Sequence, residues 1–254
     1  MTNIILNGAL GKMGRCVIKT VKQNSANFKI AAGIDPSYAE SPNNYDFNIT
    51  ANFPQNAKAD VIIDFSTANA LSGLLSFAKT NNIPLVLATT GYNKSQIDQI
   101  KEYSNLLPIF FTFNMSLGIN LVIQLIKKAF KTLGKDFDIE IIEKHHNKKI
   151  DAPSGTALML ADAINSEANG YYKYIYNRHD IRKKRDSNEI GIHAVRAGSI
   201  VGEHEVIFSS QDETISITHI ANSKSVFAAG ALKAAEFIKN KSPGLYNMNN
   251  LVGE

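Results

Sequence analysis

Apolar runs of strand length alternate with segments of helical periodicity throughout the first half of the chain. Continuous apolar strands separated by helices are typical of a parallel sheet that is covered on both faces. The pattern therefore predicts an α/β fold with a doubly wound parallel sheet. The predicted strands are 3–7, 28–34, 61–65, 84–88 and 109–113, and the predicted helices are 13–21, 71–78 and 95–103.

The alternation ends after Leu117. One strongly apolar helix, a strand and a second helix follow, and then three strand-like segments with no helix between them. Adjacent strands without intervening helices indicate an antiparallel or mixed sheet. We therefore predict two domains, with residues 1–116 and the C-terminal helical segment 226–254 in the first, and residues 117–225 forming an α+β domain with a mixed sheet. Its predicted elements are helix 119–130, strand 138–143, helix 157–164 and strands 190–195, 205–209 and 214–220.

Composition narrows the class of protein. The chain has 254 residues, of which 44% are hydrophobic and 20% charged, as in ordinary globular proteins. No apolar run is long enough for a membrane span, and residues 1–8 resemble a strand rather than a secretory signal. A cytoplasmic location is therefore expected, without membrane attachment. The net charge of +4 comes from scattered lysines, and the one tight cluster, 182–185, is interpreted as a solvated loop, so no nucleic-acid binding is expected.

Cys16 is the only cysteine. A single cysteine excludes an internal disulfide and a cysteine-rich zinc site. Because it falls on the first predicted helix, it is interpreted as a small core residue. No metal site is predicted, since His145 and His146 are adjacent and no third ligand is evident nearby.

A glycine-rich loop joins the first predicted strand to the first helix. Its glycines, Gly8, Gly11 and Gly14, have the spacing G-x-x-G-x-x-G rather than the usual G-x-G-x-x-G of dinucleotide-binding loops. The physical demand is the same, since the backbone must approach a pyrophosphate without side chains in the way, at a helix N-terminus. A simple glycine turn is the alternative, but the strand–loop–helix context favours a dinucleotide and a Rossmann-like domain. Lys12 and Arg15 would add positive charge.

Polar residues end several of the predicted strands. Asp35 ends the second strand, about 20 residues beyond the glycine loop, where an acidic residue binds ribose hydroxyls in dinucleotide-binding folds. Pro36 follows and no arginine is adjacent, so a preference for NADH over NADPH is expected. Ala88–Gly91 and Phe113–Ser116 lie at two further strand ends, where ligands bind in open α/β sheets.

The segment 143–157, EKHHNKKIDAPSGTA, carries the most chemistry. Histidines and lysines precede a small-residue turn that begins a helix. The turn presents a hydroxyl and free amides, which suit a carboxylate, while a lysine and a histidine beside it can transfer protons. A solvated basic loop is the alternative on composition alone. His193, His204 and His219 fall in strand-like segments and are interpreted as structural.

This segment closely resembles the signature of the 4-hydroxy-tetrahydrodipicolinate reductase family, and the similarity extends to the glycine loop, Thr89–Gly91, Asn114–Gly118, 196–204 and 227–231. The resemblance implies a homotetramer and reduction of a cyclic dicarboxylate by NADH or NADPH in diaminopimelate and lysine synthesis. It implies that His145 and Lys149 transfer protons and that His146, Gly155 and Thr156 bind substrate. The residues that it implies for the cofactor are Gly8, Ala9, Leu10, Gly11, Lys12, Met13, Asp35, Ala88, Thr89, Thr90, Thr112, Phe113, Asn114 and Met115.

Two alternatives are another Rossmann-fold reductase, such as a semialdehyde or homoserine dehydrogenase, and a nucleotide-sensing domain without catalysis. A phosphorylating semialdehyde dehydrogenase needs a nucleophilic cysteine, and Cys16 lies in the wrong place, on the helix after the glycine loop. Another Rossmann-fold reductase remains open. A nucleotide-sensing domain without catalysis would be favoured by loss of His145 or Lys149, and both are present.

Overall fold

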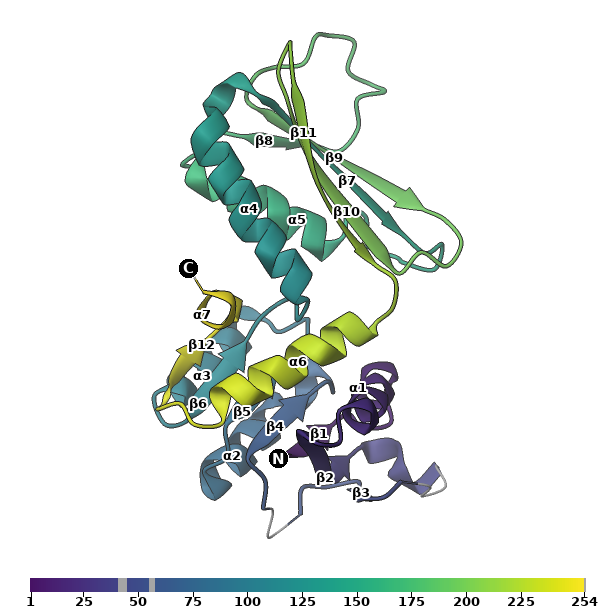
Figure 1. Ribbon diagram of the computed structural model, residues 1–254, viewed down its shortest axis with the longest axis vertical. Coiled ribbons are helices and arrows are strands. Elements are labelled where there is room, and N and C mark those ends of the chain that lie inside the picture. Colours follow the sequence, from purple (N-terminus) through teal and green to yellow (C-terminus); the bar gives the residue numbers. More distant parts are fainter. Residues whose placement is uncertain (41–44, 55–57, 254) are drawn as a thin grey trace. The chain divides into compact units, whose positions relative to one another are not determined.

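The computed structural model describes residues 1–40, 45–54 and 58–253, which form two compact units (Figure 1). The first unit comprises Met1–Leu117 and Lys224–Glu254, and the second comprises Gly118–Ser223. The chain thus leaves the first unit once and returns to it for its C-terminal segment.

The first unit is built on a seven-stranded sheet in which every pair of neighbouring strands is parallel. The strand order is β12-β6-β5-β4-β1-β2-β3. The order steps outward from β1 in both directions, which makes the sheet doubly wound. Its strands are β1 (Thr2–Asn7), β2 (Phe28–Ile34), β3 (Asn48–Thr50), β4 (Val61–Asp64), β5 (Leu85–Leu87), β6 (Pro108–Phe111) and β12 (Gly244–Tyr246).

Helices cover both faces of this sheet (Figure 1). On one face, α1 (Lys12–Gln23) and α6 (Ser225–Ile238) pack over Ile4, Leu6 and Ile63. On the other face, α2 (Leu71–Asn81) and α3 (Lys94–Ser104) pack over Ile5 and Ile62. Because successive side chains of a strand point to opposite faces, one apolar run supplies both cores. α6 comes from the far end of the sequence, and α7 (Met248–Val252) follows β12.

The second unit contains a five-stranded mixed sheet with the order β11-β10-β7-β9-β8. β8, β9 and β7 run parallel to one another, and β10 is antiparallel to both β7 and β11. α4 (Leu117–Leu133) and α5 (Gly155–Glu167) pack on one face, around Ile141, Ile192 and Phe208. No helix of this unit covers the other face (Figure 1). Its strands are β7 (Asp138–His145), β8 (Lys173–Ile175), β9 (Glu189–Arg196), β10 (Gly202–Ser209) and β11 (Thr214–Ala221).

The predicted fold class is confirmed, since a Rossmann-like parallel sheet and a mixed sheet are both present. The short strands β3, β8 and β12, each of three residues, and the short helix α7 were missed. Short 3-10 helices, also not predicted, occupy Pro36–Glu40, Ala68–Ala70 and Gly134–Asp136.

Candidate active site

The glycine loop turns sharply between β1 and α1 because no side chain fits at two of its positions. Gly8 has φ +78°, and a Cβ on it would lie 2.6 Å from the Phe65 carbonyl oxygen. A Cβ on Gly14 would lie 2.1 Å from the Gly8 carbonyl oxygen. Gly11 is more open, is exposed, and precedes α1 as its N-cap without a capping side chain. Uncapped amides at a helix start suit an anion, so this loop fits the phosphates of a dinucleotide.

Asp35 is buried beside this loop and is already hydrogen-bonded within the protein. One carboxylate oxygen accepts from the Leu10 amide at 2.9 Å, and the other accepts from the Ser37 amide and hydroxyl at 3.0 and 2.6 Å. Burial acts to raise the pKa of Asp35, but these hydrogen bonds outweigh it and the pKa is lowered. Asp35 is therefore an ionised group that ties the end of β2 to the glycine loop.

Asp64 links three strand ends on the same edge of the sheet. It is only 1% exposed. Its carboxylate accepts hydrogen bonds from Asn7 at the end of β1, Ser66 after β4 and Thr89 after β5, at 2.7, 2.6 and 2.7 Å. Sequence reasoning did not single out Asp64. It holds the hydroxyl of Thr89, one of the predicted cofactor residues, in a fixed orientation, whereas the neighbouring Thr90 is exposed.

The segment after β6 is fixed by α6. Gly230 of α6 approaches Met115 so closely that a Cβ would lie 1.7 Å from the Met115 carbonyl oxygen. Met115 is buried, Phe113 is 64% exposed, and the Thr112 hydroxyl accepts from the Asn114 amide at 3.3 Å. All predicted cofactor residues thus follow carboxyl ends of parallel strands of one sheet, the edge at which open α/β sheets bind ligands.

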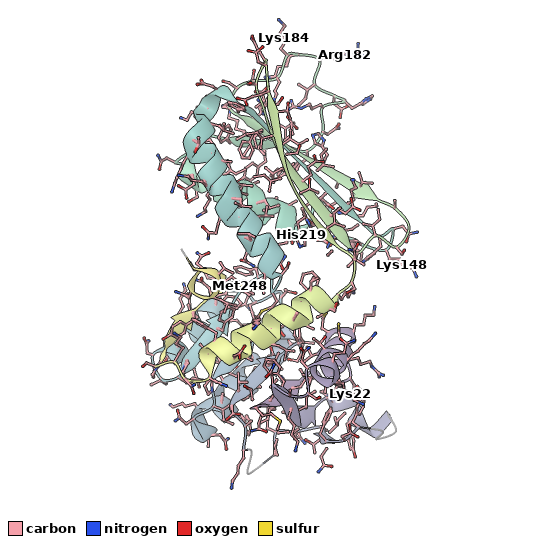
Figure 2. All side chains as sticks on the ribbon, in the orientation of Figure 1. Lys22, Lys148, Arg182, Lys184, His219 and Met248 are labelled. Carbon is pink, nitrogen blue, oxygen red and sulfur yellow. The ribbon has the colours of Figure 1, made fainter. Side chains whose placement is uncertain are left out.

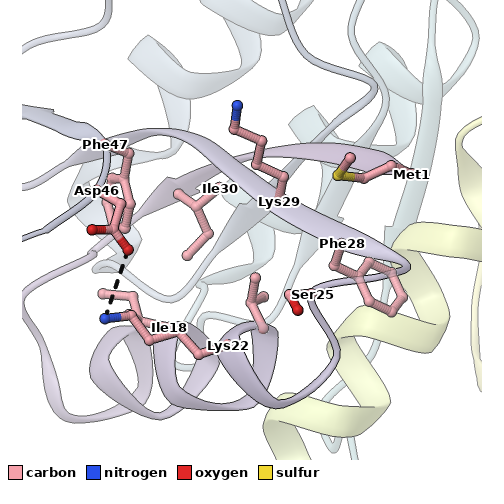
Figure 3. Close-up of a pocket in the computed structure, with 10 residues that line it drawn as sticks. Met1, Ile18, Lys22, Ser25, Phe28, Lys29, Ile30, Asp46 and Phe47 are labelled. Carbon is pink, nitrogen blue, oxygen red and sulfur yellow. Dashed lines mark ion pairs between the residues drawn. The ribbon is translucent and has the colours of Figure 1, made fainter.

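A hollow of about 290 Å³ lies at the opposite end of β2 (Figure 3). It is bordered by the C-terminal half of α1 and the beginning of β2, and the ion pair between Lys22 and Asp46, at 3.9 Å, lies at its edge. None of the predicted cofactor residues lines it. The hollow is therefore separate from the cofactor edge of the sheet.

In the second unit, β7 carries Glu143 and His145 on the face that the helices cover, because alternate residues of a strand share a face. Glu143 is completely buried. Its Oε1 accepts from Arg196 Nη2 at 2.7 Å and the Ser154 amide at 2.9 Å, and its Oε2 accepts from Arg196 Nη1 at 2.8 Å and lies 2.6 Å from His145 Nδ1. Burial acts to raise the pKa of Glu143, but these partners lower it below its ordinary value. Glu143 is therefore a buried carboxylate whose charge is fully satisfied.

His145 is held as a neutral base. Burial lowers the pKa of His145. The carboxylate of Glu143 acts to raise this pKa, and the positive charges of Lys149 and Arg196 lower it further. Because a carboxylate only accepts hydrogen bonds, the Nδ1 of His145 carries the proton and donates it to Glu143. The Nε2 atom is then the basic nitrogen, and Gly202 leaves space beside it, since a Cβ there would lie 3.1 Å from Nε2.

Two further histidines lie near His145. His204, on β10, is buried, and its ring centroid is 5.2 Å from that of His145. Its Nε2 lies 3.1 Å from the Ser154 hydroxyl oxygen. His146 is half-buried, and its Nδ1 has no hydrogen-bond partner among the described residues. His204 was interpreted as structural from the sequence, and it belongs to the same cluster as His145.

Lys149 and the start of α5 lie on the loop that follows β7. The Lys149 ammonium is 2.9 Å from Asp151. Ser154 caps α5 by accepting from the Ala157 amide at 3.2 Å, Gly155 is exposed and Thr156 is half-buried. These positions give a helix N-terminus beside a lysine and a neutral histidine, which is suited to binding an anion and moving protons.

Both halves of the chain match family models. Residues 2–115 match the model "Dihydrodipicolinate reductase, N-terminus", and residues 118–252 match "Dihydrodipicolinate reductase, C-terminus". The chain belongs to the dihydrodipicolinate reductase family.

Relatives in this family resemble the chain over nearly its whole length. The 4-hydroxy-tetrahydrodipicolinate reductase of Clostridium novyi is 49% identical over 253 residues, which cover 99% of this chain and 98% of the relative. That of Caldanaerobacter subterraneus is 48% identical over 253 residues, with coverages of 99% and 98%. Among solved structures, dipicolinate-bound dihydrodipicolinate reductase from Paenisporosarcina sp. TG-14 has the same fold, with a TM-score of 0.81, 24% identity and 99% coverage of both chains.

Exposed basic residues lie at both ends of the second unit of this family member. Lys148 is exposed at the outer end of the loop after β7, and Arg182 and Lys184 lie at the opposite end of the unit (Figure 2). The 182–185 cluster is only partly the solvated loop that we expected. Arg185 is largely buried, and it donates to Glu140 and to the carbonyl oxygens of Ile139 and Glu189.

Sequence reasoning missed Glu143 and Arg196 as members of the site, although both fall in segments that resemble the dihydrodipicolinate reductase family. An isolated acidic residue before two histidines was the available signal for Glu143. Among the described residues, no group of three His, Cys, Asp or Glu side chains is placed to hold a metal ion. No helix in the described part of the chain has the length and apolarity needed to cross a membrane.

Proposed function

We propose that this chain reduces 4-hydroxy-tetrahydrodipicolinate to tetrahydrodipicolinate with NAD(P)H, in the diaminopimelate route of lysine synthesis. In the net reaction the substrate gains a hydride and a proton and loses water, and NAD(P)H is oxidised to NAD(P)+. The observation that supports this function best is the neutral His145 held by Glu143 beside Lys149 and an anion-binding helix start, in a chain of the dihydrodipicolinate reductase family.

In this proposal the residues after β7 bind the substrate and transfer protons. The amide of Gly155 and the hydroxyl and amide of Thr156, at the first positions of α5, bind a substrate carboxylate. His146 contacts the substrate beside them. Lys149 donates a proton to the reduced substrate, and His145 takes up or returns a proton through Nε2.

The cofactor is assigned to the edge of the parallel sheet. It supplies the hydride when bound, and the residues at this edge bind and orient it. The residues assigned to it are Gly8, Ala9, Leu10, Gly11, Lys12, Met13, Asp35, Ala88, Thr89, Thr90, Thr112, Phe113, Asn114 and Met115. Two observations support this assignment. The backbone packs closely around Gly8 and Gly14, and Asp64 accepts a hydrogen bond that fixes the Thr89 hydroxyl.

NADH is the proposed preferred cofactor. Asp35 is an ionised carboxylate at the end of β2, and Pro36 follows it where a cation would be needed for a 2'-phosphate. The Asp35 Oδ2 atom accepts from the Leu10 amide and has a second lone pair for a ribose hydroxyl, whereas Oδ1 already accepts from the amide and the hydroxyl of Ser37. A 2'-phosphate would instead place negative charge against that carboxylate.

We also propose that the protein is a cytoplasmic homotetramer whose copies meet through the second unit's sheet. The face of this sheet opposite α4 and α5 carries Val195 and Ile220, which are 41% and 54% exposed. Exposed apolar residues on an uncovered sheet face are typical of subunit contacts. Light scattering during size-exclusion chromatography would give the mass, and a monomer at micromolar concentration would contradict the assembly.

A coupled assay tests the proposed function directly. The substrate is generated in the cuvette by dihydrodipicolinate synthase, and oxidation of NADH or NADPH is followed by the loss of its absorbance. We expect cofactor oxidation that requires both the synthase and this chain. Absence of oxidation with either nucleotide, from protein shown to be folded, would contradict the proposal.

A further inference from the structure

The buried carboxylate of Glu143 has no free acceptor position. Two hydrogen bonds reach each of its oxygens, from Arg196 Nη2 and the Ser154 amide on one side, and from Arg196 Nη1 and His145 on the other. Glu143 therefore has no position left for a substrate atom. Its contacts are all within the protein, and one of them is with the histidine assigned to proton transfer.

Such a carboxylate determines which nitrogen of His145 is protonated. As an ionised acceptor it stabilises the Nδ1–H tautomer and leaves Nε2 as the base. Arg196 reaches the carboxylate with both terminal nitrogens, a planar two-point contact that fixes the carboxylate plane as well as its charge. Arg196 thereby fixes the Glu143 carboxylate, and the carboxylate fixes the His145 ring.

Arg196 and Glu143 also hold the segment from Asp151 to Ser154, at the end of the loop that follows β7. Arg196 Nη2 also donates to the Asp151 carbonyl oxygen at 2.6 Å, and Glu143 accepts from the Ser154 amide at the beginning of α5. Lys149 lies two residues before Asp151, and Gly155 directly follows Ser154. The base, the lysine and the helix start are thus tied to one buried ion pair.

We propose that Glu143 and Arg196 are positioning residues of the reaction, which fix the Nδ1–H tautomer and the orientation of His145 so that its Nε2 faces the substrate. This inference rests on the proposed role of His145. Neither residue touches the reacting atoms. Both act through the imidazole ring and through the loop that ends at Ser154.

Substitutions at the two residues have opposite electrostatic effects on His145. Glu143 raises the pKa of His145 and Arg196 lowers it. Glu143→Gln removes the charge and places an NH2 group against existing donors. Where this NH2 group faces His145, the ring can bond it only by accepting at Nδ1. We therefore expect Glu143→Gln to lower the pKa of His145 and to shift its proton from Nδ1 toward Nε2. Arg196→Met removes the cation, so we expect the pKa of His145 to rise.

Glu140 offers a matched control on the same strand. It also binds a histidine, with His193 Nε2 at 2.8 Å, and it also pairs with arginines, but it points to the other face of the sheet. Glu140→Gln breaks a comparable network without touching His145. Glu143→Asp keeps the charge and tests whether the carboxylate alone restores the tautomer.

The experiment is nitrogen NMR of the full chain with 15N-labelled histidine, in which the His145 signals are assigned from their loss in His145→Gln. In the unmodified chain we expect Nδ1 protonated and Nε2 unprotonated at neutral pH. We expect the tautomer to change in Glu143→Gln, to be restored in Glu143→Asp and to be unaffected in Glu140→Gln. An unmodified chain with Nε2 protonated would overturn the proposal, and this measurement remains decisive if Glu143→Gln does not fold.

Kinetics provides the second readout. We expect Glu143→Gln to lower kcat by about 10²- to 10⁴-fold, the range for losing a positioned acid–base group, with a smaller change in the substrate KM. The His145 limb of the pH profile of kcat/KM should move to lower pH in Glu143→Gln and to higher pH in Arg196→Met. Equal shifts in the same direction, or an equal loss in Glu140→Gln, would overturn the positioning role.

The two readouts separate this inference from the proposed function. The NMR measurement needs neither substrate nor cofactor. A chain with the expected tautomer and no reductase activity would count against the proposed function and leave the orientation of His145 supported. A chain that reduces the substrate with an inverted His145 tautomer would overturn only the inference.

Discussion

Gly14 packs directly against Gly8, with space for a hydrogen atom and nothing larger, since a Cβ on Gly14 would lie 2.1 Å from the Gly8 carbonyl oxygen and 2.5 Å from that of Ala9. The first turn of α1 is thereby held against the end of β1. A Cβ on Gly11 would instead lie 3.3 Å from its nearest neighbour and would face outward. The glycines of one loop thus serve two different physical purposes.

We expect Gly14→Ala and Gly11→Ala to fail in different ways. Gly14→Ala forces backbone apart and should lower the melting temperature by several degrees, as expected for a loss of about 1–3 kcal/mol. Gly11→Ala should fold normally and lose affinity for the nucleotide, because its methyl group stands where the phosphates approach. Thermal unfolding and calorimetric titration with NADH measure the two effects. A Gly11→Ala protein that binds NADH normally would show that the loop does not hold the phosphates.

Lys149→Met tests the proton donor. Removing a positioned general acid typically lowers the rate by about 10²- to 10⁴-fold, and we expect a kcat loss in that range with NADH affinity nearly unchanged. Lys148→Met is the matched control, since Lys148 is the next residue on the same loop, is exposed and points outward (Figure 2). Near-normal turnover in Lys149→Met, or an equal loss in Lys148→Met, would refute the assignment.

The Asp35 carboxylate should favour NADH over NADPH. Two unit charges about 4 Å apart at a protein surface repel by up to about 4 kcal/mol, and a quarter of that gives a bias of about five-fold. We expect kcat/KM to be higher with NADH in paired titrations at one ionic strength. Asp35→Ser should reduce the difference in kcat/KM between NADH and NADPH, and Pro36→Arg should reduce it further. Because Asp35 also accepts from the Leu10 amide, Asp35→Asn is the better control for loop geometry.

A clear NADPH preference in the unmodified chain would contradict this prediction. It would point to Lys12 or Arg15 as the partner of the 2'-phosphate, since both are exposed at the start of α1. Arg15 is held by a hydrogen bond of 2.8 Å from its Nε to the Leu10 carbonyl oxygen.

The main elements of the fold were predictable because each carries its own pattern. The apolar strands that form the two cores and the amphipathic α1 were found within a few residues. β3, β8 and β12 were missed because each has three residues, too few to show a period. Their pairing depends on backbone hydrogen bonds to a neighbouring strand, which no local pattern encodes.

The candidate site was predictable only where its residues are adjacent in sequence. His145, Lys149 and Gly155 lie within one segment, and its chemistry could be inferred from residue types. Arg196 is 53 residues from Glu143. The contact between them requires the parallel pairing of β7 with β9, in a register that sets His145 opposite Arg196. A register is a property of the folded sheet, so the ion pair could not be predicted from spacing.

His204 makes the second unit sensitive to acid. Burial lowers its pKa to about 3, with His145 contributing to the shift and Glu143 opposing it. In the unfolded chain His204 has an ordinary pKa near 6.5. The unfolded state therefore binds a proton that the folded state does not, from about pH 6 down to the folded pKa. Above this pH range, the contribution of His204 to the free energy of unfolding is fully present. As the pH is lowered through the range, this contribution falls by about 1.4 kcal/mol per pH unit.

His204→Gln removes the group that binds a proton on unfolding. The variant keeps a polar group near the Ser154 hydroxyl, which lies 3.1 Å from His204 Nε2. We expect the variant to lose some stability at neutral pH, because the ring leaves a gap in a buried cluster. Between about pH 6 and about pH 4, its free energy of unfolding in urea should fall less steeply than that of the unmodified chain, by about one proton. His145 and His219, whose pKa values burial also lowers, still contribute to the remaining slope. Parallel pH curves for the two proteins, or a His204 NMR signal that titrates near pH 6 in the folded chain, would show that His204 is not held neutral by burial.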